Sequence, residues 1–91
     1  MPTIAIFYGI VVRMYFHDHN PPHFHVQYGG ARALVRIADG SILAGELPPT
    51  AASLVRQWAL DRRPALELNW RRAGAGEPIE RIAGPDGDGN G

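Results

Sequence analysis

The spacing of the apolar residues changes at Gly45, and this change constrains the fold more than any other feature of the 91-residue sequence. Before Gly45, short runs of β-branched and aromatic residues are punctuated by glycine, which is typical of strands. After it, Leu54, Val55 and Trp58 recur with helical spacing. The sequence therefore predicts an α+β fold: an antiparallel sheet of four or five strands followed by two helices and a short C-terminal extended arm.

Glycine-containing turns separate the expected strands. The pairs Gly29-Gly30 and Asp39-Gly40 are of the kind that closes tight hairpins. Hairpins join strands that are neighbours in the chain, so we expect an antiparallel meander. The predicted strands cover residues 3–8, 10–16, 24–28, 31–37 and 41–44.

Proline residues mark the start of both expected helices. A proline pair before Thr50 suits the first turn of a helix over residues 50–62. Pro64 then starts or kinks a second helical stretch through about Ala73. Both helices carry a tryptophan at an apolar position, and we expect the two to be core anchors rather than base-stacking platforms: Trp58 and Trp70.

The length of the chain supports one domain, because a chain of this size buries roughly 60–65% of its unfolded surface. We expect that domain to cover residues 1–83, with Ile79 and Ile82 docking the arm on the core. The glycine-rich acidic segment 84–91 has little to bury and is expected to be disordered. No apolar run has the length of a transmembrane helix and the first residues lack a signal peptide pattern, so we expect a cytoplasmic protein without membrane contact.

The residues able to carry chemistry concentrate in one decapeptide, HDHNPPHFHV, which contains all four histidines of the chain. Histidine titrates near neutral pH and is a common metal ligand. Because side chains alternate along a strand, His23 and His25 would share a face, with their alpha carbons roughly 6.6 Å apart. Both rings could then reach one ion at about 2.0–2.1 Å per Zn–N bond.

Four residues are candidates both for catalysis and for metal binding: Asp18, His19, His23 and His25. A divalent metal, zinc or manganese, is the expected cofactor. Asp18, or Glu46 folded across, would complete an open three-ligand site that activates water. For Glu46, capping of the first helix is the favoured alternative. Two interpretations of the histidines stay open. They form a metal-binding or acid/base cluster, or they are hydrogen-bonded residues that fix the stiff Pro21-Pro22 connector to the sheet.

Composition excludes several classes of site. The chain has no cysteine, which rules out disulfides, thiolate metal sites and cysteine nucleophiles. Nine basic and nine acidic residues give no net charge, which argues against general electrostatic binding of nucleic acid. Every basic residue is arginine, however, and arginine binds phosphate bidentately. Arg32 and Arg36 share a face of a predicted strand and are the candidates for RNA binding, with a solvated strand face as the alternative.

Several motifs together resemble a family of small bacterial proteins. MPTI at the start, DHNPPHFHV, GELP before the first expected helix, and NW followed by GEP are similar to domain-of-unknown-function family 4160 over about residues 1–83. The resemblance implies a compact α+β domain of a sheet plus two helices, without an established activity. It also implies a set of recurring polar positions, which are Asp18, His19, Pro21, Pro22, His23, His25, Glu46 and Trp70. His17 is not one of them.

The resemblance further implies a partner. Members of this family look like one half of two-gene modules whose other half is a second small domain, family 2442, and such pairs resemble toxin–antitoxin systems. The leading hypothesis is a toxin-like module that cleaves RNA phosphodiesters through its histidine cluster, beside a small cognate protein encoded nearby. The alternative is a non-enzymatic interaction domain with a structural histidine loop. The sequence leaves open whether the chain forms a homo-oligomer.

Overall fold

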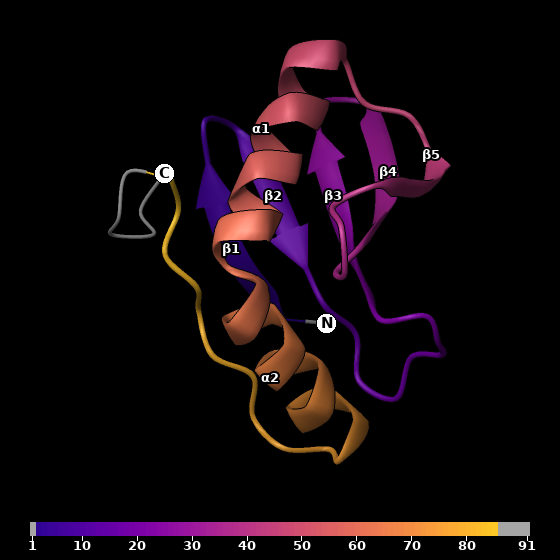
Figure 1. Cartoon of the computed structure of the whole chain (residues 1–91), viewed down its shortest axis with the longest axis vertical. Coiled ribbons are helices and arrows are strands. Elements are labelled where there is room, and N and C mark those ends of the chain that lie inside the picture. The colour runs from indigo at the N-terminus through magenta and orange to yellow at the C-terminus, as the bar shows by residue number, and fades with distance from the viewer. Residues whose placement is uncertain (1, 86–91) are drawn as a thin grey trace.

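The computed structural model describes residues 2–85 as a five-stranded antiparallel sheet followed by two helices (Figure 1). Each strand pairs with its neighbours in the chain, so the sheet is a meander in the order β1-β2-β3-β4-β5. The predicted α+β class and the order of the elements are confirmed. The elements are β1 (Thr3–Phe7), β2 (Ile10–Arg13), β3 (His23–Tyr28), β4 (Ala31–Arg36), β5 (Ile42–Gly45), α1 (Pro49–Asp61) and α2 (Arg63–Gly74).

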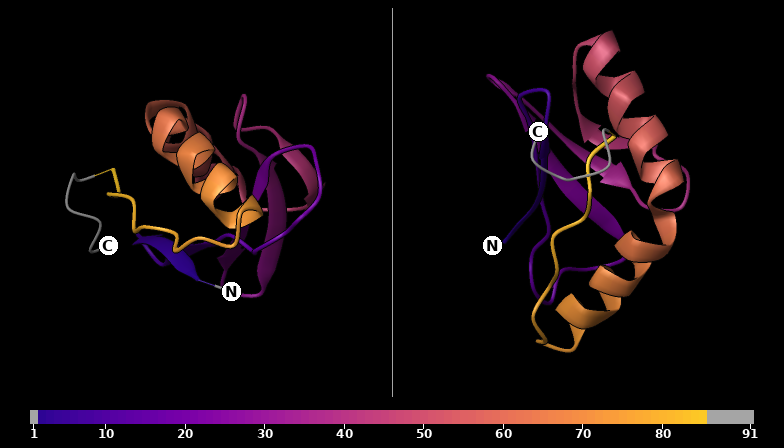
Figure 2. Two further views of the ribbon diagram at one scale, coloured as in Figure 1. Left: turned by 90° about the horizontal axis from the view of Figure 1, so that it is seen from below. Right: turned by 90° about the vertical axis from the view of Figure 1, so that its left-hand side faces the viewer.

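The two helices form a layer on one face of the sheet (Figure 2). Phe24 and Val26 of β3 are buried on this inner face, and the ring of Trp58 from α1 lies edge-on to Phe24 at a centroid distance of 5.7 Å. The core between the layers also holds Phe7, whose ring centroid lies 5.1 Å from that of Trp58. The opposite, outer face of the sheet carries the alternate residues of each strand, including His25.

The second strand is shorter than the sequence predicts. β2 ends at Arg13, whereas the expected strand continued to Phe16. The amide of Met14 donates a hydrogen bond to the carbonyl of Pro2, and His17 adopts a left-handed φ of 56° that turns the chain. Phe16, the last residue of the predicted strand, therefore lies beyond the end of β2 and is exposed.

The C-terminal arm docks on the core, as expected from its isoleucines. Ile82 is buried, and its amide donates a 2.7 Å hydrogen bond to the carbonyl of Ile4 at the edge of β1. The indole N–H of Trp58 donates to the carbonyl of Ala83 at 2.7 Å. The arm, yellow in Figure 1, therefore runs beside β1. The expected disorder concerned residues 84–91. Gly84 is buried, and its carbonyl accepts a hydrogen bond from Arg62 at 2.8 Å, whereas residues 86–91 lie outside the described part of the chain.

Close approach between β4 and β5 requires a glycine at the end of β5. Gly45 has a φ of +80°, and a Cβ at this position would collide with the backbone carbonyl of Arg32. The two strands are thus held together where the chain leaves the sheet for α1. Neither α1 nor α2 is long and apolar enough to cross a membrane.

Candidate metal centre

The connector between β2 and β3 carries Asp18 over the start of β3. The amide of His17 donates a hydrogen bond to the carbonyl of Ala73 at 3.2 Å, which ties the connector to the end of α2. At its other end, the carbonyl of Pro22 accepts from the amide of Ile37 at 3.1 Å. Both ends of the connector are fastened to other elements, so the position of Asp18 is set by the fold.

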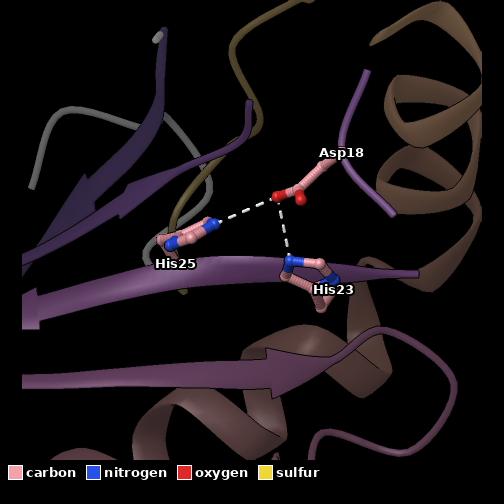
Figure 3. Close-up of side chains that lie close together, drawn as sticks. All are labelled: Asp18, His23 and His25. Carbon is pink, nitrogen blue, oxygen red and sulfur yellow. Dashed lines mark hydrogen bonds and ion pairs between the residues drawn. The ribbon is translucent and has the colours of Figure 1, made fainter. Parts of the chain in front are cut away.

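The carboxylate of Asp18 lies between two imidazoles (Figure 3). Its Oδ2 atom is 3.0 Å from Nε2 of His23 and 3.3 Å from Nε2 of His25. One ligand atom from each of the three residues lies within 4.8 Å of the other two. Asp18, His23 and His25, here called the Asp-His-His cluster, are therefore positioned to hold one metal ion.

The two histidines of the cluster differ in burial. The side chain of His23 is 3% exposed and packs against the ring of Trp70 on α2, at a centroid distance of 5.3 Å. The side chain of His25 is 31% exposed and stacks on Tyr15, at 4.1 Å and an interplanar angle of 29°. The cluster therefore has a closed inner side and an open outer side.

The hydrogen bonds of His23 restrict its protons. Its Nδ1 lies 2.8 Å from the carbonyl oxygen of Pro21, and a carbonyl can only accept, so Nδ1 carries the hydrogen. The Nε2 atom then faces a second acceptor, the carboxylate of Asp18. That contact is favourable only with a second ring proton or with a cation between the two atoms. A ligand histidine whose other nitrogen donates to a backbone carbonyl is also the usual arrangement at metal sites.

The carboxyl group of Asp18 is held in its ionised form. Partial burial raises the pKa of this carboxyl, but the hydrogen bonds from the amide of His19 and from His25 lower it, as do the charge and hydrogen bond of His23. The net effect is a pKa below the ordinary value of 3.8. Asp18 therefore carries the negative charge that a cation needs.

The other two histidines lie outside the Asp-His-His cluster. His19 was expected to be a ligand or a catalytic residue; its Nδ1 is 3.1 Å from the second carboxylate oxygen of Asp18, and its side chain is 86% exposed. It therefore contacts the cluster from the solvent side. His17 is exposed, and its contribution is the turn that its backbone makes.

The two arginines expected to bind RNA lie in different surroundings. Arg32 lines a cavity of about 260 Å³ on the outer face of the sheet, and His25 lines the same cavity. The guanidinium of Arg36 lies farther along β4 and pairs with the carboxylate of Asp39 at 3.7 Å. Of these two arginines, Arg32 lines the cavity beside the Asp-His-His cluster and Arg36 does not.

The expected capping of the first helix by Glu46 is wrong. Helix α1 begins at Pro49 with Pro48 as its N-cap residue, and no acidic residue lies in its first turn. The amide of Glu46 instead donates to the carbonyl of Arg32 at 3.0 Å, so this residue still belongs to the end of the sheet. Its side chain is exposed and is not part of the Asp-His-His cluster.

Sequence reasoning missed two residues near the cluster. Tyr15 supports the ring of His25, and Arg13 is the cross-strand neighbour of His25 in the β2–β3 register. Because side chains alternate along a strand, Arg13 and Tyr15 would share one face of the predicted strand over residues 10–16. No sequence pattern predicts the register between β2 and β3 that brings this face next to His25.

Comparisons with known proteins give a family and no activity. No curated protein and no solved structure matched the chain. The family described as Domain of unknown function (DUF4160) matches residues 9–71, which include β2 to β5, both histidines of the cluster and most of the helical layer. Because this match covers more than half of the sequence, the chain belongs to the DUF4160 family.

Proposed function

We propose that the Asp-His-His cluster binds one divalent cation, zinc or manganese, and that the protein uses it to hydrolyse phosphodiesters in RNA. The observation that carries this proposal is the convergence of two Nε2 atoms on a single carboxylate oxygen. Imidazole nitrogen and carboxylate oxygen are ligands that suit both metals. Two histidines and one carboxylate also make up the protein ligands of known zinc hydrolases, in which a further position stays open for water.

The direction of the imidazoles favours metal binding over metal-free acid/base catalysis. An acid/base pair needs ring nitrogens that face the substrate. In His23, however, one nitrogen faces Pro21 and the other faces Asp18. The Nε2 atom of His25 also faces Asp18. Two of the four ring nitrogens are therefore directed toward the place where a cation would lie, and a third is occupied by the carbonyl of Pro21.

The burial of the two histidines divides their roles. A divalent cation held by these ligands supplies a Lewis acid and lowers the pKa of a bound water. His23 is buried and fixed by Pro21, so it sets the geometry from the inner side. His25 borders the open cavity, so RNA would approach from that side. Asp18 provides the charge that balances the cation.

We place this activity in a toxin-like module controlled by a small cognate protein encoded nearby. An enzyme that hydrolyses cellular RNA without restraint would stop growth, so a dedicated inhibitor is the simplest control. The resemblance to two-gene modules supports the same arrangement. Expression of the chain alone should inhibit growth, and co-expression of its neighbour should restore it.

Cleavage of RNA by the purified protein tests the proposal. Activity should require added zinc or manganese, disappear with a chelator, and return when the metal is restored. His25→Ala should abolish cleavage while the protein remains folded, and His19→Ala should retain it, because His19 lies outside the cluster. Metal-independent cleavage, or harmless expression together with no cleaved RNA, would refute the hydrolase assignment.

A second function is favoured by the free edge of the sheet. Within residues 2–85, strand β5 pairs with β4 alone, and its Ile42 and Leu43 are 40% and 36% exposed. An edge strand with exposed aliphatic residues can pair with a strand of another protein. In this alternative the chain is a non-enzymatic domain that binds its cognate protein through β5. Leu43→Lys should then abolish co-purification of the neighbouring gene product, whereas His25→Ala should leave it intact.

A further inference from the structure

The cavity beside His25 lies on the outer face of the sheet. It has a volume of about 260 Å³ and is bordered by β2, β3, β4 and β5. Arg13 and His25 are direct cross-strand partners, as are Gln27 and Arg32. These two neighbouring cross-strand pairs therefore bring Arg13 and Arg32 to one cavity, here called the arginine cavity.

The lining of the arginine cavity includes Arg13 and Arg32 and, among the described residues 2–85, no acidic side chain. Arg13 donates a 3.0 Å hydrogen bond from Nη1 to the amide oxygen of Gln27, which is neutral. Neither Arg13 nor Arg32 takes part in an ion pair with a carboxylate in the described residues 2–85. Two guanidinium groups without counter-charges favour an anion in the cavity.

The size of the cavity limits that anion. Sites for drug-sized ligands occupy about 300–1,000 Å³. A cavity of about 260 Å³ lies just below this range, so it has room for no more than one nucleotide unit. The apolar side chains of Leu34 and Ala44 line the same cavity and offer a surface for a base or a ribose. A phosphate ester fits this combination better than a simple inorganic anion does.

We infer that the arginine cavity binds a nucleotide through its phosphate, with Arg13 and Arg32 as the phosphate ligands. This inference rests on the proposed function, because it assigns the cavity to the RNA unit next to the cleaved bond. His25 belongs to both the cavity and the Asp-His-His cluster. A phosphate held by the arginines would therefore place the adjoining phosphodiester beside the cluster.

The test is a nuclear magnetic resonance titration of the metal-free protein with uridine 3′-monophosphate and, separately, with inorganic phosphate. Saturable shifts should appear at residues of the arginine cavity, and the nucleotide should bind more tightly than inorganic phosphate. Arg32→Gln should weaken nucleotide binding about tenfold or more, because it removes hydrogen bonds to a charged group. Arg13→Lys should weaken it as well, since lysine lacks the bidentate geometry.

Arg36→Gln is the matched control. Arg36 lies on the same strand and the same face as Arg32, but outside the cavity and paired with Asp39. This variant should bind the nucleotide as the wild type does. Equal loss in Arg32→Gln and Arg36→Gln, equal binding of nucleotide and inorganic phosphate, or no saturable shifts would each overturn the inference. The titration involves neither metal nor hydrolysis, so its failure is distinguishable from failure of the metal centre.

Discussion

The two faces of β3 differ in what they contribute to the molecule. On the inner face, Phe24 and Val26 are buried among apolar side chains of the helical layer. On the outer face, His23 and His25 contact one carboxylate. These residues alternate along one strand, so the packing that fixes the inner face also fixes the spacing of the two imidazoles. Stability and metal binding should therefore respond to different substitutions.

The largest effect on stability is expected at Trp58, on the inner side. Trp58→Ala should lower the free energy of unfolding by about 3–5 kcal/mol, because the indole is buried against Phe7 and Phe24. Denaturant unfolding measures the change. Leu60→Ala on the same helix is the control, since Leu60 is exposed and should have a small effect. A midpoint that hardly moves in Trp58→Ala would contradict the assigned core.

The largest effect on metal binding is expected at His25. Loss of a residue that only orients a ligand costs about 10–100-fold in affinity, so loss of a ligand should exceed about 100-fold. His25→Ala should show this loss in a competition titration with a zinc indicator. His19→Ala should leave the affinity nearly unchanged. Equal losses in the two variants would mean that any exposed histidine near Asp18 suffices.

His23 contributes both to the stability of the fold and to the metal site. Its replacement should therefore change both the free energy of unfolding and the metal affinity. His23→Ala removes a buried ring that is hydrogen-bonded to both Pro21 and Asp18. The free energy of unfolding of the metal-free protein should therefore fall by about 1–3 kcal/mol. Metal affinity should fall together with it. Thermal unfolding without metal, compared with His25→Ala, separates the two contributions. Undiminished stability would show that His23 serves the metal site alone.

The smallest effect is expected in the acid stability of the metal-free protein. The pKa of Asp18 lies below 3.8 in the folded chain, so its ionised form stabilises the fold above about pH 3.8. That contribution is lost as the pH falls through the lowered pKa. The difference in unfolding free energy between wild type and Asp18→Asn should therefore be present at neutral pH and shrink below pH 3.8.

Asp39 provides the control for this pH dependence. Hydrogen bonds from the hydroxyl and the amide of Ser41 lower the pKa of its carboxyl as well. Asp39→Asn should change the dependence of the unfolding free energy on acid pH in the same direction as Asp18→Asn does. It should leave the metal affinity unchanged, because Asp39 lies on a hairpin outside the cluster. A pH profile of Asp18→Asn that runs parallel to the wild type would contradict the role given to Asp18.

The sequence predicted the elements of the fold because their signals are local. Alternation, hairpin glycines and helical spacing each act over a few residues. The failures arose where distant contacts decide. Phe16 follows the strand alternation, but the chain turns at His17 and is tied to Ala73 of α2. Glu46 has the charge of a helix cap, but its amide is bonded to β4.

The same distinction applies to the site. The shared face of His23 and His25 follows from alternation within one strand, and the proximity of Asp18 follows from a short, stiff connector. The contacts of His25 with Tyr15 and Arg13 depend instead on the register between β2 and β3. No local pattern specifies that register, because the connector between the two strands is not a tight hairpin.

The metal content of the protein after equilibrium dialysis tests the central claim most directly. Chelator-treated wild type, His19→Ala and His25→Ala would be dialysed at neutral pH against zinc and, separately, manganese, and the bound metal measured by elemental analysis. The account predicts one tightly bound ion per chain of wild type and of His19→Ala, and loss of that ion in folded His25→Ala. Absence of both metals from the wild type, or an unchanged content in His25→Ala, would contradict it.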